Sequence, residues 1–344
     1  MPQAVDDRTS GRHIPRPEAP QFGAYLAMDV FHGTATLDRA LREPVVAIGN
    51  FDGVHRGHAA LIDLAVTQAS ARGGEAVVLT FEPHPARVLA PGLAPPLLTS
   101  LERKLALLAA RGVGATVIEP FTRELAGHTA AAFVEETLCK RLGMREVVVG
   151  FDFTYGAQRL GNVATLGAAA GVHRFKVHVV APLAVDGLVA SSTKIREFVL
   201  EGNVAGAALL LGRAFDVEGT VMRGAGRGRG LGVPTANVAV EGELCPRPGV
   251  YTVTLTRLDA AGTPVHDAVA NLGTNPTFAR AGASGALSLE AHLLDWDGDL
   301  YGQRVRVAFH GRLRDEQRFS SAAALVTQIH ADIQEARRRF GTTA

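Results

Sequence analysis

The stretch GNFDGVHRGH occupies residues 49–58, between a β-branched run at Val45–Ile48 and a helical stretch at 58–72. A strand that passes through a glycine-rich turn into a helix is typical of the first half of a βαβ unit. In open α/β sheets such a turn lies at the carboxyl end of the strand, where ligands bind. The stretch therefore predicts a parallel sheet and also the place of its binding site.

The same alternation of strand and helix extends outward to about residue 200. Parallel strands need crossover connections of about a dozen residues, so we predict a mostly parallel sheet with helices on both faces. The expected strands are 45–48, 76–80, 115–118, 146–149 and 176–180, and the expected helices are 58–72, 101–111, 130–142, 192–199 and 204–211.

After Gly212 the pattern changes to runs of β-propensity without long helices, which indicates an antiparallel barrel or sandwich. One amphipathic helix at about 322–339 closes the chain. We expect a disordered tail at 1–25 and two domains at 26–205 and 206–344. The expected strands of the second domain are 219–222, 250–258, 265–272, 287–294 and 305–309.

The composition restricts the class of protein. A chain of 344 residues with 47% hydrophobic and 20% charged residues is typical of a folded protein of about two domains. Its 35 Lys and Arg residues against 34 Asp and Glu residues give no basic field, so we expect neither nucleic acid nor a membrane as partner. Without an apolar N-terminal region, a long apolar run or paired cysteines, the expected location is the cytoplasm. Nothing in the sequence indicates an oligomeric state.

The two histidines of the first motif point to phosphate chemistry. His55 and His58 are three residues apart, so they project to one side of a helical turn. Free N–H groups at the helix N-terminus suit a phosphate, and Gly53 and Gly57 allow close approach to the backbone. The alternative is a helix start with two surface histidines. The position of the whole string after a strand favours the phosphate site.

A second candidate phosphate site is SSTKIR at 191–196, where Ser191, Ser192 or Thr193 can cap a helix. Arg196 could make bidentate contacts with a phosphate. An ordinary helix cap with solvated basic side chains is the alternative.

Aromatic residues follow two of the strands, in TFEPHP at 80–85 and VGFDFTYG at 149–156. Aromatic side chains there could pack on a planar ring, although core packing explains them equally well. His84 is a candidate substrate contact, with a purely structural role left open.

The second domain carries the segment GRGLGVPTAN at 228–237. If it is extended, Thr235 and Asn237 point to the same side, and their oxygens suit Mg²⁺. Alternation over 287–294 places Glu290 on a polar face. Glu290 is then either a solvated carboxylate or a general base for phosphoryl transfer, and the sequence pattern does not separate the two.

Taken together, these segments resemble the prokaryotic bifunctional riboflavin kinase/FAD synthetase family. The resemblance covers about residues 28–340 of the chain, in order across both domains. The matching motifs are GNFDGVHRGH at 49–58, TFEPHP at 80–85, VGFDFTYG at 149–156, SSTKIR at 191–196, LLGRAF at 210–215, GRGLGVPTAN at 228–237, GVY at 249–251, NLGTNPTF at 271–278, LEAHLLDWDGDLYG at 289–302 and LRDEQRF at 313–319.

The resemblance implies a Rossmann-like nucleotidyltransferase domain with a parallel sheet, followed by a six-stranded antiparallel β-barrel with a C-terminal helix. It implies that the barrel phosphorylates riboflavin to FMN with ATP, and that the first domain adenylylates FMN to FAD and releases pyrophosphate, with Mg²⁺ as cofactor. Two rival functions remain: a nucleotidyltransferase acting on another phosphorylated substrate, which the barrel motifs disfavour, and a flavin-binding module with a decayed kinase site, which the intact barrel residues disfavour.

The resemblance also implies roles for individual residues. In the first domain, His55, His58 and Arg196 would be catalytic, the ATP phosphates would contact Gly49, Asn50, Asp52, Gly57, Ser192 and Thr193, and the flavin would contact His84, Asp152, Phe153 and Tyr155. In the barrel, ATP would contact Gly230, Gly232, Thr235 and Asn237, with Thr235 and Asn237 also binding Mg²⁺ and Glu290 acting as the catalytic base.

Overall fold

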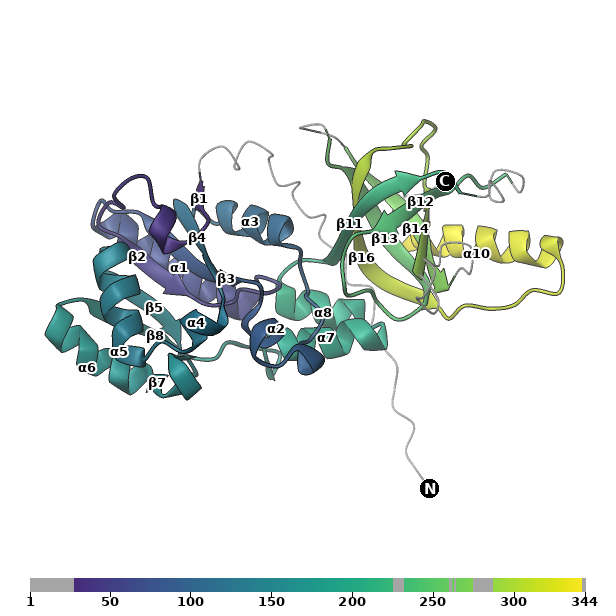
Figure 1. The fold of residues 1–344 in the computed structure, drawn as a ribbon. Coiled ribbons are helices and arrows are strands. Elements are labelled where there is room, and N and C mark those ends of the chain that lie inside the picture. The colour runs from purple at the N-terminus through teal and green to yellow at the C-terminus, as the bar shows by residue number, and fades with distance from the viewer. Residues whose placement is uncertain (1–27, 225–231, 260–261, 263, 275–286, 342–344) are drawn as a thin grey trace, which may run out of the picture. The chain divides into compact units, whose positions relative to one another are not determined.

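The computed structural model describes residues 28–224, 232–259, 262, 264–274 and 287–341 (Figure 1). The chain divides into two compact units, which we call the sheet unit and the barrel unit. Among the described residues, the sheet unit comprises 28–196 and 209–212, and the barrel unit comprises 197–208 and 213–341.

The sheet unit is built on six parallel strands in the order β1-β4-β3-β2-β5-β8. This confirms the predicted parallel sheet. From β2 the chain moves to β3 and β4 on one side and later to β5 and β8 on the other, so a topological switch point lies between β2 and β5. The strands are β1 (Asp29–Phe31), β2 (Val45–Ile48), β3 (Ala76–Glu82), β4 (Ala115–Pro120), β5 (Glu146–Gly150) and β8 (Lys176–Val180).

Helices cover both faces of the sheet, as the buried runs of its strands require. Val45 and Ala47 of β2 pack toward Ile62 of α1 (Arg56–Ala71) and Leu108 of α3 (Leu101–Ala109). Val46 and Ile48 face the opposite cluster, which includes buried residues of α6 (Val163–His173) and of the helical segment 130–141. The shorter elements are α2 (Pro85–Leu89), α4 (Arg123–Ala126), β6 (Thr154–Tyr155), β7 (Gly161–Asn162), β9 (Ala184–Val185) and β10 (Leu188–Val189), with single 3₁₀ turns η2 (Thr34–Thr36), η3 (Pro91–Leu93) and η5 (Ala157–Arg159).

Three elements differ from the prediction. Strand β1 was not predicted, because it is too short to show a periodicity. Helix α6 was not predicted either, because it contains too few polar residues for an amphipathic pattern. The expected helix at 130–142 begins as α5 (Ala130–Ala132) and continues as a π-helix, η4 (Phe133–Arg141). Its wide hydrogen-bonding pattern ends with the N–H of Leu142 donating to Thr137 O over 3.1 Å. Hydrophobic spacing over so few residues does not distinguish a π-helix from an α-helix.

Two helices follow the last strand of the sheet: α7 (Ser192–Glu201) and α8 (Val204–Leu211). Of the three hydroxyl residues that could cap α7, Ser191 does so, because its Oγ accepts the N–H of Lys194 over 3.2 Å. Gly202 ends the helix with a φ of 80°, as the glycine at that position predicted.

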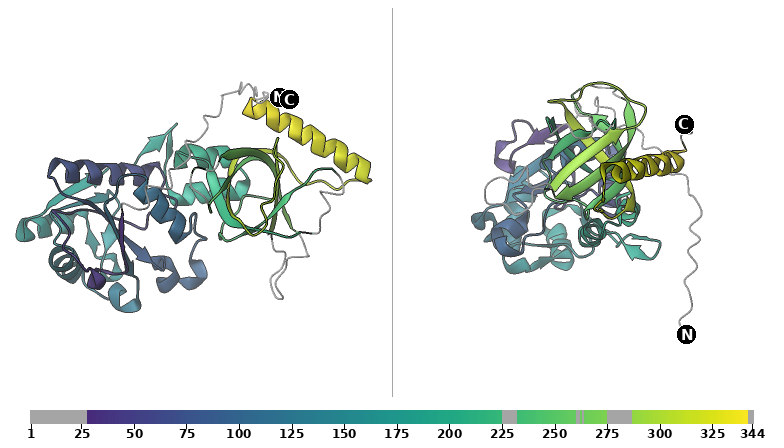
Figure 2. Two further views of the ribbon diagram at one scale, coloured as in Figure 1. Left: turned by 90° about the horizontal axis from the view of Figure 1, so that it is seen from above. Right: turned by 90° about the vertical axis from the view of Figure 1, so that its right-hand side faces the viewer.

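The barrel unit is a closed barrel of six antiparallel strands in the order β11-β12-β15-β14-β13-β16 (Figure 2). This confirms the expected barrel and also its C-terminal helix, α10 (Ala322–Phe340), which packs against β13 and β14. Gly219 allows β11 and β12 to cross closely, since a Cβ there would lie 2.2 Å from Ala239 O. The strands are β11 (Phe215–Met222), β12 (Ala236–Val240), β13 (Gly249–Arg257), β14 (Val265–Thr274), β15 (Leu287–Leu293) and β16 (Arg304–Arg314).

Strand β12 was not predicted as a strand, because the proline and threonine before it interrupt the alternation of apolar and polar residues. Helix α10 is attached to the barrel by a buried ion pair between Arg314 and Asp332, 2.8 Å apart, and by the fully buried Ala336. Within the described residues, no helix combines the length and apolar character needed to cross a membrane.

His310 of β16 makes the stability of the barrel sensitive to pH. Its Nε2 lies 2.9 Å from Thr254 Oγ and its ring meets the edge of Phe340 from α10. Burial lowers the pKa of His310 to about 4. Between that value and the ordinary value of about 6.5, the unfolded chain binds a proton that the folded chain does not, so acidification favours unfolding.

We therefore expect the free energy of unfolding of the barrel to fall by up to about 3 kcal/mol between pH 7 and pH 4 through this residue. Urea unfolding monitored by fluorescence of Trp296, the single tryptophan of the chain, reports on the barrel. The His310→Gln variant should lose most of this dependence, relative to the wild-type protein. An identical pH slope in both proteins would contradict the assignment.

Candidate functional site

The loop between β2 and α1 has a strained backbone. Phe51 and Val54 adopt positive φ angles of 49° and 38°, which a β-branched residue rarely does. Full burial of the Phe51 side chain holds the loop in this conformation. Gly53, with φ 82°, lies so close to Leu98 that a Cβ would come within 2.7 Å of that side chain. The loop is therefore held in one shape by packing.

The two histidines of the motif lie together at the start of α1. His55 caps the helix, since its Nδ1 accepts the N–H of His58 over 3.3 Å. Their rings are stacked with centroids 3.6 Å apart. Burial lowers the pKa of His58 well below its ordinary value, and the charges of His55 and Lys104 lower it further. His58 Nδ1 is sealed from solvent and has no hydrogen-bond partner among the described residues.

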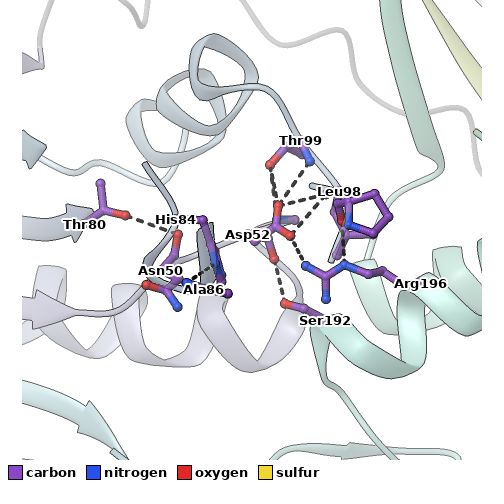
Figure 3. Close-up of polar contacts among 11 residues, drawn as sticks. Asn50, Asp52, Thr80, His84, Ala86, Leu98, Thr99, Ser192 and Arg196 are labelled. Atoms are coloured by element: carbon purple, nitrogen blue, oxygen red, sulfur yellow. Dashed lines mark hydrogen bonds and ion pairs between the residues drawn. The ribbon is translucent and has the colours of Figure 1, made fainter. Parts of the chain in front are cut away.

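The carboxylate of Asp52 is buried and fully engaged within the protein (Figure 3). The backbone N–H groups of Leu98 and Thr99 donate to Oδ1 over 3.0 and 3.2 Å. Arg196 of α7 donates to Oδ2 in an ion pair. Asp52 therefore joins the loop, the segment before α3 and the first turn of α7.

The predicted residues of the 191–196 segment differ in their surroundings. The Ser192 hydroxyl donates to Asp52 O over 2.9 Å, and Arg196 Nε donates to Pro96 O over 2.7 Å. Thr193 is exposed. Gly57 packs against the protein, since a Cβ there would lie 3.1 Å from the His55 ring. The structure thus brings Ser192 and Arg196 to Asp52 and leaves Thr193 facing solvent.

A cavity of about 700 Å³ opens at the carboxyl ends of the sheet strands, and its volume is that of a site for a drug-sized ligand. The rings of Phe153 and Tyr155 lie nearly parallel in it, with centroids 5.3 Å apart. The four predicted flavin contacts (His84, Asp152, Phe153 and Tyr155) line this cavity, as do Gly49 and Asn50.

The remaining apolar lining was missed by sequence reasoning. Phe81, Leu89, Phe121 and Phe133 come from four separate segments of the chain. Each has an ordinary core pattern in its own segment, so no local signal identifies it as part of a site.

His84 also has a structural function. It caps α2, because its Nδ1 accepts the N–H of Ala86 over 3.2 Å. Burial lowers the pKa of His84 below its ordinary value, and the neighbouring Asp52 partly opposes this. A neutral ring at the edge of the cavity is the result.

In the barrel, Glu290 of β15 lies directly opposite Asn237 of β12. On its other side it lies opposite Asn271 of β14, a residue that the sequence did not single out. Directly opposed residues share one face of a sheet, so the three side chains form a row across three strands. Leu289 and Ala291 are fully buried on the opposite face, which confirms the predicted alternation.

Thr235 lines a second cavity of about 350 Å³, together with Trp296 and Tyr301. His292 of β15 fixes the segment before Thr235, since its Nδ1 lies 2.8 Å from Pro234 O. Gly232 adopts a φ of 76°, and Gly230 lies outside the described residues. The structure thus places Thr235 in a cavity and Asn237 beside Glu290 on the adjoining strands.

The described ranges contain no group of three His, Cys, Asp or Glu side chains that could hold a metal ion. The predicted site residues of the barrel supply the hydroxyl of Thr235, the amide of Asn237 and the carboxylate of Glu290. None of these three side chains has a hydrogen-bond partner in the part of the chain that is described. Such hard oxygen donors fit Mg²⁺, which usually completes its shell with water and substrate phosphates.

Comparison with known proteins identifies both units. Residues 37–194 match the FAD synthetase family model, and residues 211–340 match the riboflavin kinase family model. The bifunctional riboflavin kinase/FMN adenylyltransferase of Pseudomonas fluorescens is 39% identical over 90% of this chain and 97% of its own. The enzyme of the same name from Escherichia coli K12 is 38% identical over 92% and 99%.

A solved structure described as a macrolide-efflux protein from Streptococcus pneumoniae has the same fold, with a TM-score of 0.79 and 29% identity over 90% of this chain and 99% of that one. The two family models and the full-length relatives agree on one assignment. The chain belongs to the bifunctional riboflavin kinase/FMN adenylyltransferase family, with its FAD synthetase domain at the N-terminus and its riboflavin kinase domain at the C-terminus.

Proposed function

We propose that residues 26–205 make FAD at the loop 49–58 and the adjoining cavity, and that residues 206–344 make FMN at Glu290. The observation that carries this division is that Glu290 lies beside Asn237 with no described partner, whereas the Asp52 carboxylate of the loop is engaged by Arg196. Phosphorylation of riboflavin needs a base for a neutral hydroxyl. Adenylylation of FMN does not, because the phosphate of FMN is itself the nucleophile.

In the sheet unit, the aromatic cavity is the proposed seat of the flavin ring. Its volume and its stacked Phe153 and Tyr155 rings suit a planar ligand. Gly49 and Asn50 line the same cavity and begin the loop that leads to the histidine pair. A flavin held there has its phosphate directed toward the start of α1, where free N–H groups favour anions.

His58 acts as a neutral donor to the ATP phosphates, with His55 stacked beside it. A lowered pKa keeps His58 uncharged at neutral pH, so that its ring nitrogens can hydrogen-bond to a phosphate without a change of charge. Catalysis here consists of positioning and charge neutralisation. Gly57, Ser192 and Thr193 are the further proposed backbone and hydroxyl contacts.

Asp52 is a positioning residue in this proposal. Its two oxygens are already engaged by Leu98, Thr99 and Arg196. A second anion at the same carboxylate would be repelled. We therefore assign to Asp52 the placement of Arg196, whose remaining guanidinium N–H groups are the proposed phosphate donors.

In the barrel, Glu290 is the proposed base for the 5′-hydroxyl of riboflavin. Thr235 and Asn237 would hold Mg²⁺, with Gly230 and Gly232 in the loop that contacts ATP. The ion would supply positive charge for the phosphates of ATP. The cavity beside Thr235, with Trp296 and Tyr301 in its wall, is the proposed seat of the ATP nucleoside.

A cytoplasmic location is also proposed, because Cys139 and Cys245 are both free thiols, as a reducing compartment allows. The substrates riboflavin, FMN and ATP follow from the two activities. The net charge of +1 gives no support to nucleic acid or a membrane as further partners.

The Glu290→Gln variant should lose about 100-fold or more in kcat for riboflavin phosphorylation, because the base is removed. Adenylylation of supplied FMN should stay within about twofold of the wild-type rate. The exposed Glu201→Gln variant is the matched control. An equal loss of both activities, or no loss of either, would rule out the assigned division of roles.

The His58→Ala variant should show the opposite pattern, with FAD formation from FMN and ATP reduced about 100-fold and riboflavin phosphorylation retained. Both rates are measured by chromatographic separation of the flavins. The exposed His173→Ala variant controls for loss of a histidine, and retained FMN binding shows that the sheet unit is folded. Undiminished FAD formation would refute the first site.

Removal of divalent cations with a chelator should abolish riboflavin phosphorylation, and Mg²⁺ should restore it. In the Asn237→Ala variant, the Mg²⁺ concentration for half-maximal rate should rise about tenfold, with the KM for riboflavin little changed. A Mg²⁺ dependence equal to that of the wild-type enzyme would exclude Asn237 as a ligand.

A further inference from the structure

Lys104 of α3 is a buried cation that the proposed function does not yet use. The residue is 6% exposed, although lysine is almost never buried without a partner. Only four lysines occur in the chain, at positions 104, 140, 176 and 194. Burying an ammonium group costs several kcal/mol unless an anion accompanies it.

Lys104 follows closely, along the chain, the segment that is bound to Asp52. Leu98 and Thr99 are bound to Asp52, and Ser100 then caps α3 by accepting the N–H of Arg103 over 3.1 Å. The N–H of Lys104 donates to Ser100 O over 2.9 Å. Lys104 therefore lies one turn beyond the segment that Asp52 holds.

The charge of Lys104 acts on groups from several other segments. Asp52 of the loop and Glu82 of β3 stabilise it, and it lowers the pKa values of His58 and His84. His84 lines the aromatic cavity, and His58 belongs to the histidine pair at the start of α1. The buried charge of Lys104 therefore acts both on the histidine pair and on a residue that lines the aromatic cavity.

No close anion balances this charge. Among the described residues, the Lys104 ammonium makes no hydrogen bond and has no carboxylate oxygen within 4.0 Å. Asp52 is already paired with Arg196, which leaves only longer-range attraction from Asp52 and Glu82. Burial accordingly lowers the pKa of Lys104.

We propose that Lys104 is a catalytic residue of FMN adenylylation, whose ammonium group contacts the β- and γ-phosphates of ATP. The proposal rests on the site proposed above for the sheet unit. In the reaction, an FMN phosphate oxygen forms a bond to the α-phosphorus, and the bond from that phosphorus to the bridging oxygen breaks. The electron pair leaves with pyrophosphate, and Lys104 keeps its proton while neutralising the charge that develops on the leaving group.

A structural function for Lys104 predicts different behaviour from a catalytic one. If Lys104 served only to balance Asp52 or Glu82, its replacement by an uncharged residue of similar shape would lower the stability of the protein. It would also weaken the use of FMN and of ATP to the same extent. If it awaits a substrate anion, the Lys104→Met variant should be as stable as the wild-type protein or more so, since a costly buried charge is removed. The variant would then lose activity only through its use of ATP, and its binding of FMN would be unchanged.

The test compares Lys104→Met and Lys104→Arg in the full chain, with Lys140→Met as control for loss of an exposed lysine. In Lys104→Met, kcat/KM of FMN adenylylation at saturating FMN should fall about 100-fold. FMN binding, measured by flavin fluorescence, should stay within about threefold, and riboflavin phosphorylation should be unchanged. Lys104→Arg, which keeps the charge, should recover part of the loss.

Activity of Lys104→Met within about threefold of the wild-type value would overturn the proposal, as would an equal loss of FMN binding and ATP use. The comparison with His58→Ala distinguishes failure of the Lys104 proposal from failure of the proposed site. If His58→Ala is inactive and Lys104→Met is active, only the role of Lys104 is wrong. If both variants keep full activity, the proposed site itself is wrong.

A second measurement uses the wild-type protein, so that folding of a variant plays no part. Acetic anhydride labels lysine amines, and all four lysines lie in residues 104–194, outside the riboflavin kinase match. Pyrophosphate should slow acetylation of Lys104 about fivefold or more and leave Lys140 and Lys176 unaffected. Equal labelling of Lys104 with and without pyrophosphate would overturn the proposal.

Discussion

The buried ion pair between Asp52 and Arg196 joins segments of the sheet unit that lie far apart in the sequence. Asp52 belongs to the loop after β2, Arg196 to the first turn of α7, and the same carboxylate holds the backbone of Leu98 and Thr99 before α3. Breaking a buried pair of this kind by removing one partner costs about 3–5 kcal/mol. The relative positions of the loop, the segment before α3 and α7 depend on this contact.

This constraint also sets how charge is distributed around the proposed adenylylation site. Asp52 neutralises Arg196, the neutral His58 contributes no charge, and Lys104 is left without a close counterion. In the proposed site the charge of Lys104 is available for ATP, while the strained loop at Phe51 and Val54 is kept in place by packing. The arrangement is preorganised, which is what transition-state stabilisation by fixed charges requires.

In the barrel, strand register places the proposed base, Glu290. Asn237, Glu290 and Asn271 are held in a row by strand register alone, and the carboxylate of Glu290 has no described partner. A carboxylate without a partner can act as a base, whereas the engaged carboxylate of Asp52 holds other segments in position. Two acidic residues that look alike in a motif thus receive different proposed functions from their surroundings.

Much of the fold follows from the sequence. The parallel sheet and the helix α10 follow from hydrophobic periodicity, because a buried strand and an amphipathic helix have different repeats. The π-helix at 133–141 and strand β12 do not, because nine residues and a proline-containing run carry too little periodic signal. The resemblance of ten ordered motifs added the six-stranded barrel and the two activities.

By itself, then, the sequence determined the two fold classes, the family and the residues that begin each site, because local patterns and ordered motifs are written along the chain. Only the tertiary structure decided that Asp52 is occupied by Arg196, that Phe81, Phe121 and Phe133 share one cavity with Phe153, and that Lys104 is buried without a close anion. Each of these facts is a contact between residues distant in the chain. Their burial and pairing depend on how the strands and helices pack, which no local pattern records.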